Sequence, residues 1–161
     1  MQTFLPLPDL MESLKSLDYR RLGKQRVEAM QLIKSMVLQE PELLEYLHSD
    51  ARRRLSLPAE WNPSEQKIGW ANHPAREMWR GHIGALAIYH DSSIVAWTIR
   101  GYKNTMPFLS APGKHELPAW FGDEDFHASH RSNLLRKDPL WYDKFGWTEP
   151  TDLEYVWPSR H

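Results

Sequence analysis

The part of the sequence best equipped for chemistry is residues 19–28, YRRLGKQRVE, where basic side chains surround one carboxylate. Four positive charges fall within residues 20–26, and Lys24 and Glu28 share a face if the segment is helical. The pattern is typical of a solvated helix face with one weak ion pair. It also fits a cluster that binds phosphates around a catalytic carboxylate, and the residues alone leave both interpretations open.

A second candidate is His73, which precedes Pro74. The residue before a proline is biased toward extended backbone, so His73 is expected at the start of the helix that follows. The first turn of a helix has unpaired N–H groups that can bind a phosphate. A cap formed by Asn72 or His73 explains the same pattern without any ligand.

A third candidate is residues 126–133, FHASHRSN, followed by Arg136 and Lys137. This stretch is polar and has few aliphatic residues, so we interpret it as the wall of a polar site. His127 and His130 have a spacing that could bind a metal, and residues 123–125 are acidic. They match no recognised metal-binding signature.

The elements that must position these residues are predicted to be helices, because apolar residues recur at helical spacing and few alternating runs appear. Helices are expected after Asp9 or Ser13, from Asp18 to Val37, from Pro41, over 75–90 with a continuation to Gly101, and over 126–137. Residues 51–72 and 103–122 are predicted to be loops. The expected fold class is all-α: a compact single-domain helical bundle with long irregular loops.

The amino-acid composition excludes several classes of protein and of functional site. The 161 residues are 41% hydrophobic and 25% charged, which fits one globular domain spanning residues 1–161. Zero cysteines exclude disulfides, a thiol nucleophile and a cysteine-ligated metal. No apolar run or leader predicts a membrane span or signal peptide, so a cytoplasmic protein is expected. The net charge of −1 argues against a uniformly basic nucleic-acid binder but leaves room for local basic patches.

Eight tryptophans are many for this length. Trp79, Trp97 and Trp141 fall on apolar stripes and are predicted to build the core. An unstacked base could instead lie against another tryptophan, for which the candidates are Trp70, Trp120 and Trp147.

Taken in order, these segments resemble the pyrimidine-dimer DNA glycosylase/AP lyase family of the phage endonuclease V type. The resemblance lies in order and spacing: Tyr19-Arg20, Leu22 and Arg26-Val27 after a short helix; His73 before a long helix ending in Arg100-Gly101; and PLWY at 139–142 followed by Phe145-Gly146. The stretches RRLGKQRVEA and FHASHRSNLLRKDP resemble a signature of a divergent cellular branch of that family.

The resemblance implies a helical domain that acts on a damaged or modified pyrimidine in double-stranded DNA, with no metal and no cofactor. In that family an N-terminal α-amine attacks the sugar C1′, releases the base and forms a Schiff base that undergoes β-elimination. Basic side chains hold the flanking phosphates. The residues we expect to contact DNA are Arg20, Arg21, Arg26, His127, His130, Arg131, Asn133 and Arg136.

The sequence departs from the family pattern at two positions. The family's glutamate directly follows its Tyr-Arg pair, where this chain has Arg21, so Glu28 becomes the candidate catalytic carboxylate. The family's mature chain starts with a threonine left after methionine removal, whereas Gln2 is too large for that removal and Met1 is expected to stay.

Two amines are candidate nucleophiles, the Met1 α-amine and Lys24, and His73 is a third candidate catalytic residue. We favour Met1, because an α-amine has a reference pKa of ~7.7–8.0 against ~10.4 for lysine. Two alternatives remain. One is a nucleic-acid-binding module that keeps the fold without the chemistry, and the other is a metal-dependent hydrolase built on His73, His127 and His130. We expect the protein to be a monomer.

Overall fold

The computed structural model describes residues 1–69 and 71–158, and these residues form helices and loops without a β-strand. The expected all-α class is therefore confirmed. The elements in chain order are α1 Leu10–Ser16, α2 Tyr19–Gln39, the 3-10 helix η1 Pro41–Tyr46, α3 Ala51–Arg54, η2 Pro63–Glu65, α4 Pro74–Glu77, α5 Ile83–Ile99, α6 Glu124–Lys137, α7 Pro139–Tyr142 and η3 Asp143–Phe145. An isolated antiparallel bridge joins Leu47 to Ser110.

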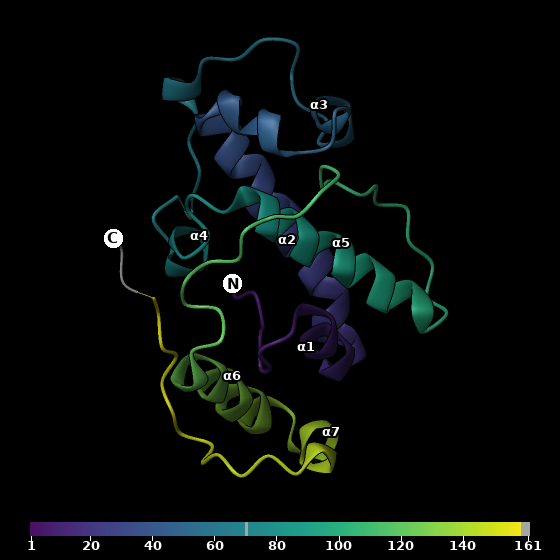
Figure 1. The fold of residues 1–161 in the computed structure, drawn as a ribbon, viewed down its shortest axis with the longest axis vertical. Helices are drawn as coiled ribbons and strands as arrows, with labels where there is room; N and C mark the ends of the chain where they lie inside the picture. The colour runs from purple at the N-terminus through teal and green to yellow at the C-terminus, as the bar shows by residue number, and fades with distance from the viewer. Residues whose placement is uncertain (70, 159–161) are drawn as a thin grey trace.

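The two longest helices, α2 and α5, pack side by side and form the centre of the molecule (Figure 1). Helix α2 buries an apolar stripe that includes Leu22 and Ile33, as its periodicity predicts. Helix α5 is apolar on most of its surface because it is buried on several sides. Gly23 of α2 lets the helices approach closely, since a Cβ there would lie 3.1 Å from the ring of Trp97.

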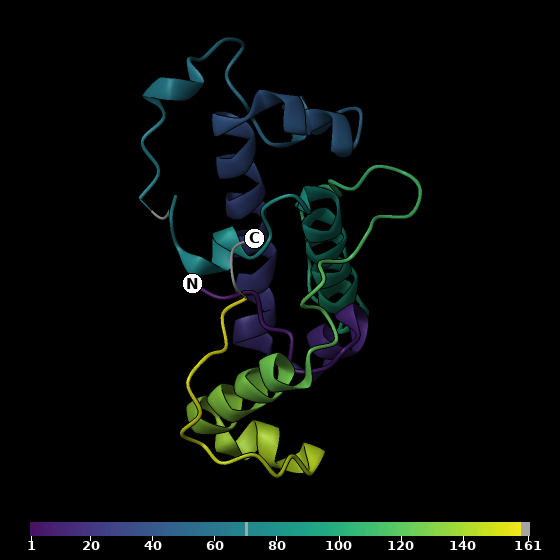
Figure 2. The ribbon, with the colours of Figure 1, turned by 60° about the vertical axis from the view of Figure 1, so that its left-hand side comes forward.

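Helices α6 and α7 lie together at one end of this pair (Figures 1 and 2). The first residues of the chain run between α6 and the two central helices. The C-terminal segment returns along α6, and the two ends of the described chain lie near each other in both views. No helix in the described ranges is long and apolar enough to cross a membrane.

The first two helices start as predicted, because Asp9 and Asp18 each cap a helix with the side chain accepting a hydrogen bond from a backbone N–H of the first turn. Helix α6, predicted over 126–137, begins at Glu124 instead, and Asp123 caps it in the same way. The helix predicted over 75–90 is wrong in its first half, which contains the short α4, then a turn, and then α5. Gly81 explains the break, because its φ of +81° is left-handed and ends a right-handed helix.

Candidate active site

The feature that organises the site is the N-terminal segment, residues 2–6, which runs through the interior without regular secondary structure. Helix α6 holds it by three side chains. The Leu5 N–H donates to His130 Nδ1 (2.9 Å), and His127 Nδ1 donates to the Leu5 carbonyl (2.7 Å). Arg131 donates to the Pro6 carbonyl (2.8 Å). These bonds satisfy backbone groups that would otherwise be buried without partners.

The two central helices hold the same segment from the other side. Gln25 of α2 accepts a hydrogen bond from the Phe4 N–H (3.0 Å), and the buried Tyr89 hydroxyl of α5 donates to the Phe4 carbonyl (2.9 Å). The Trp79 indole donates to the Thr3 hydroxyl (3.0 Å). An N-terminal segment fixed along its length in this way gives the Met1 α-amine a defined position.

That position is a cavity of about 280 Å³, called here the amine cavity. It is lined by Met1, Gln2, Phe4, Arg21, Lys24, Gln25, Glu28, Lys137 and Tyr155. Three of the four residues that the sequence suggested for catalysis therefore border one space, although Met1 and Glu28 come from different segments of the chain.

Glu28 is the only carboxylate that lines the amine cavity among the described residues. Its burial raises the pKa of the carboxyl above its ordinary value. The positive charge of the N-terminus, the Gln2 N–H, Lys24 and the Gln25 amide (3.5 Å) act in the opposite direction and favour the ionised form. The amine and the carboxylate are thus close enough to interact electrostatically.

His73 is also close enough to the amine to interact with it electrostatically. Burial lowers its pKa, and the positive charge of the N-terminus lowers it further. Its Nδ1 accepts a hydrogen bond from the Ala75 N–H (3.0 Å), so His73 is the cap of α4. Its ring makes an edge contact with Trp157 at 6.0 Å. His73 therefore combines the capping role with a place near the amine.

A larger groove of about 800 Å³ adjoins the amine cavity. It is lined by Asp18, Tyr19, Arg20, Arg21, Lys24, Lys137, Asp138 and Trp141. The residues that line both spaces are Arg21, Lys24 and Lys137, and we call these three the cationic ridge.

The cationic ridge is only partly neutralised. Arg21 pairs with Asp18 (3.1 Å), but Lys24 and Lys137 form no ion pair with any described carboxylate. Burial lowers the pKa of Lys137, and the nearby charges of Arg21 and Arg136 lower it further. Crowded like charges are a favourable place for an anion.

The interpretation of the polar α6 stretch as a DNA-contacting wall is wrong for most of its residues. His127, His130 and Asn133 are at most 1% exposed, and Arg131 is 8% exposed. The two histidines and Arg131 hold the N-terminal segment, and Arg131 also pairs with Glu124 and Glu149. Their side chains are polar because the irregular segments packed on α6 need hydrogen-bond partners, and they are not free to contact DNA.

The remaining arginines lie in different places. Arg20 lines the groove, with its Nε hydrogen-bonded to the Tyr19 hydroxyl. Arg26 instead lies 4.4 Å from the Trp97 ring centroid and donates to Asn104 (2.6 Å). Arg136 is exposed but bonds the Asn133 side chain and the Thr151 carbonyl. Neither Arg26 nor Arg136 lines the cavity or the groove.

The geometry does not support a metal-dependent hydrolase built on His73, His127 and His130. Both ring nitrogens of His127 are engaged, Nδ1 with Leu5 and Nε2 with the Gly122 N–H (3.0 Å). Within residues 1–69 and 71–158, no group of three or more histidine, cysteine, aspartate or glutamate side chains is arranged to hold a metal ion.

The sequence interpretation missed Lys137 and Tyr155 as residues of the amine cavity. Lys137 was visible as part of a basic pair, but Tyr155 reaches the cavity only because the C-terminal segment folds back along α6. Among the proposed base platforms, Trp120 packs on Trp79 (5.1 Å) and Trp147 stacks on Tyr142, and Trp70 lies outside the described residues.

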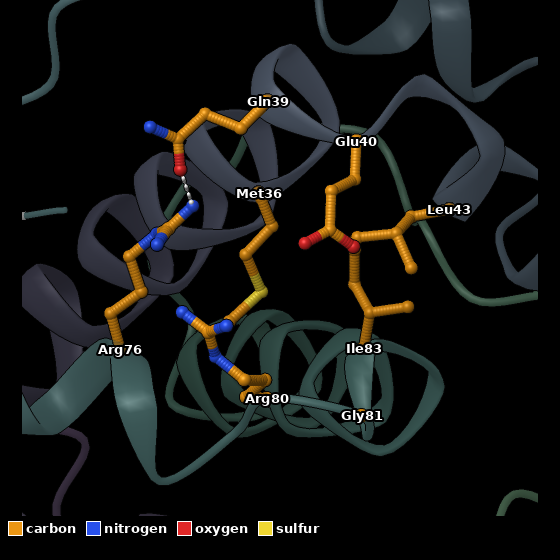
Figure 3. A pocket seen from close by; sticks show the side chains of 8 residues that line it. All are labelled: Met36, Gln39, Glu40, Leu43, Arg76, Arg80, Gly81 and Ile83. Atoms are coloured by element: carbon orange, nitrogen blue, oxygen red, sulfur yellow. Dashed lines mark hydrogen bonds between the residues drawn. The ribbon is translucent and has the colours of Figure 1, made fainter. Parts of the chain in front are cut away.

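A separate cavity of about 310 Å³ lies between α2, η1 and the turn before α5 (Figure 3). Its walls include Met36 and Ile83, and the side chains of Glu40 and Arg80 extend into it. Arg76 in its wall donates to Gln39 (2.6 Å). None of the residues expected to act in catalysis or DNA binding lines this cavity, so we place the candidate site at the amine cavity.

Comparison with known proteins gives one match. A family model described as pyrimidine dimer DNA glycosylase matches residues 1–110. The matched range includes the N-terminal segment, Glu28 and His73, and ends before α6 and the C-terminal segment. A search of curated proteins and a search of solved structures each found no match.

Proposed function

The chain belongs to the pyrimidine dimer DNA glycosylase family, and from this membership we propose that it is a glycosylase with AP lyase activity whose nucleophile is the Met1 α-amine. The observation that carries the proposal is the α-amine beside the half-buried Glu28, at the end of a segment anchored by α2, α5 and α6.

In the first step the lone pair of the amine attacks C1′ of the target nucleotide. The bond between C1′ and the base breaks, and the base leaves with the electron pair and takes up a proton. The nitrogen then gives up one proton, and the bond between C1′ and O4′ breaks while O4′ takes up a proton. This opens the sugar ring and gives a protonated imine between the Met1 nitrogen and C1′. The Glu28 carboxylate stabilises the positive charge that develops at C1′ and on the imine nitrogen.

In the second step a proton leaves C2′ and the bond from C3′ to its phosphate oxygen breaks, which cuts the strand by β-elimination. Water then hydrolyses the imine and frees the amine. Glu28 is the group we assign to accept the C2′ proton. The lowered pKa of His73 keeps it neutral near pH 7, so it adds no positive charge beside the amine.

The DNA backbone would bind along the cationic ridge. A nucleotide whose sugar reaches Met1 has its phosphate near Arg21, Lys24 and Lys137, and the adjoining groove with Arg20 has room for its neighbour. Lysine and arginine contacts to phosphate supply most sequence-independent affinity for DNA. These residues replace the buried side chains of α6 as the proposed phosphate contacts.

The anchored segment that directly follows Met1 favours the α-amine over Lys24 as the nucleophile. Lys24 is exposed on the surface of α2, and no hydrogen bond or ion pair among the described residues fixes its amine. A reacting group is most effective when it is held in place before the substrate arrives. Lys24 is better suited to binding a phosphate.

The test is borohydride trapping on a duplex with one abasic site. The wild type should form a covalent adduct, and Glu28→Gln should bind the duplex but lose roughly 10²- to 10⁴-fold in the rate of adduct formation. Glu45→Gln, which changes an exposed glutamate outside the site, is the matched control. Duplex binding without any adduct would support the non-catalytic binding module instead, and a fully active Glu28→Gln would remove Glu28 from the mechanism.

A further inference from the structure

A row of aromatic and basic side chains lies on the surface where the start of α2 meets the end of α5, outside the amine cavity. The two helices run antiparallel, so Tyr19 lies 6.3 Å from Tyr102 between ring centroids (Figure 1). Tyr102 packs on Trp97 at 4.3 Å, with the two rings inclined by 31°. The Arg26 guanidinium lies 4.4 Å from the centre of the same Trp97 ring. The row, which we call the stacking strip, consists of Tyr19, Arg20, Arg26, Trp97, Tyr102 and Lys103.

The backbone at the end of α5 holds the rings of the stacking strip in place. Gly101 has a φ of +89°, a left-handed conformation that ends the helix and turns the chain. The Trp97 indole donates a hydrogen bond to the Lys103 carbonyl (2.8 Å), which fixes the turn that carries Tyr102. Tyr19 is nevertheless 50% exposed and Tyr102 is 41% exposed. The strip therefore presents ordered aromatic rings that the protein itself leaves partly open.

The basic residues of the stacking strip are not neutralised by the protein. Arg20, Arg26 and Lys103 form no ion pair with any carboxylate in the described part of the chain. The Arg26 Nε is buried and has no hydrogen-bond partner among the described residues, and burial lowers the pKa of this side chain. Positive charges without counter-ions favour the binding of a polyanion.

Open aromatic rings beside positive charges are suited to unpaired DNA. In a duplex the faces of each base are covered by the neighbouring bases, so a surface ring cannot stack on them. Single-stranded DNA exposes these faces, and it is commonly bound by stacking on aromatic rings together with basic contacts to the backbone. The stacking strip is also continuous with the groove beside the amine cavity, because Tyr19 and Arg20 line that groove. A strand that leaves the groove can therefore continue onto the strip.

We propose that the stacking strip binds the unpaired nucleotides of a single-stranded stretch of DNA that adjoins the duplex held at the groove. The inference rests on the proposed function for the position of that duplex. One base stacks on the Tyr102 ring, and Tyr19 supplies a second ring beside it. The exposed Arg20 and Lys103 contact the neighbouring phosphates. The strip thus directs the protein to target nucleotides that lie next to a junction between single- and double-stranded DNA.

The experiment compares two tailed duplexes that carry the same charge. Each contains a tetrahydrofuran abasic analogue beside a single-stranded tail, which is oligo(dT) in one and a chain of tetrahydrofuran residues, with equal phosphates and no bases, in the other. The analogue lacks the C1′ oxygen that an imine requires, so the wild type binds it without cleavage. By fluorescence anisotropy the wild type should bind the oligo(dT) tail roughly 5- to 150-fold more tightly, the range for one base stack, and Tyr102→Ala should bind both tails equally.

Further variants separate stacking from charge and from folding. Tyr102→Phe should keep the preference for the oligo(dT) tail, whereas Tyr102→Leu should lose it. Lys103→Ala should weaken binding to both tails and reduce the slope of log K against log[salt] by about 0.7, the value for one contact to a single strand. Tyr46→Ala removes an exposed tyrosine on η1 and should change neither quantity.

The duplexes are made with the tail at the 5′ end and again at the 3′ end. Equal binding of the two kinds of tail by the wild type at both ends, or a preference for bases that survives Tyr102→Ala, would overturn the inference. Wild-type trapping on a blunt duplex with a natural abasic site involves no tail, so its presence or absence tests the proposed function separately.

Discussion

His130 provides a quantitative test of how α6 anchors the N-terminal segment. Burial and, to a lesser extent, the nearby His127 together lower its pKa from 6.5 to about 3. The ring is neutral in the folded protein, with Nδ1 accepting the Leu5 N–H. Because the folded pKa lies below the unfolded one, the unfolded chain binds more protons between these values. The stability that His130 contributes is complete above about pH 6.5 and is lost as the pH falls.

The size of the effect follows from the two pKa values. As the pH falls from 7.5 to 5.0, protonation of this histidine stabilises the unfolded chain by the equivalent of about 1.5 pK units. Each unit corresponds to about 1.4 kcal/mol. His130 alone should therefore lower the free energy of unfolding by about 2 kcal/mol over this interval. The expected loss of stability at pH 5.0 is nearly the same for any folded pKa below about 4, because folded His130 then binds almost no protons at that pH and unfolded His130 binds nearly one.

The assay is urea unfolding of the wild type and of His130→Gln at both pH values. The glutamine oxygen can accept the Leu5 N–H but does not titrate, so the variant keeps the acceptor and removes the proton. Other groups titrate in both proteins and cancel in the difference. The wild type should lose about 2 kcal/mol more than the variant. Equal losses in the two proteins would show that His130 is not held neutral by the fold.

Three other predictions concern the assigned roles. Lys137→Ala should reduce the slope of log K against log[salt] for duplex binding by about one. Lys114→Ala changes an exposed lysine that lines neither the amine cavity nor the groove and should leave the slope unchanged. Arg131→Ala should lower the free energy of unfolding by about 3–5 kcal/mol, because it leaves Glu149 part-buried and unpaired. Under conditions where this variant is folded, the salt dependence of its duplex binding should equal that of the wild type. Single-turnover cleavage should fall as the pH drops through the raised pKa of Glu28, and a rate independent of pH from 4 to 7 would contradict its role as a carboxylate.

Much of the fold could be predicted because its signals are local. Aspartate caps mark the starts of α1 and α2, and apolar stripes mark their buried faces. Both signals depend on residues within a few turns. The break before α5 was harder to predict, because the apolar spacing over 75–90 continues through Gly81. A glycine inside a helical pattern costs only about 1 kcal/mol, so tertiary packing decides whether the helix continues.

The site residues on α2 could be predicted from the sequence, whereas the role of α6 and the position of Tyr155 could not. Lys24 and Glu28 share one helix face, so their spacing identified them together. The role of α6 was misread because its histidines and Arg131 satisfy a distant, irregular N-terminal segment, and a sequence does not show which backbone groups lack partners. Tyr155 was missed for the same reason, since its position depends on how the tail docks on α6.

The most direct test of the Met1 assignment is to locate the covalent bond. The unmodified protein is reduced with borohydride on abasic-site DNA, digested, and analysed by mass spectrometry. The predicted result is a sugar adduct on the α-nitrogen of the peptide that begins at Met1, and no adduct after N-terminal acetylation. An adduct on a peptide containing Lys24 or Lys137, or one that persists when the N-terminus is acetylated, would contradict the assignment.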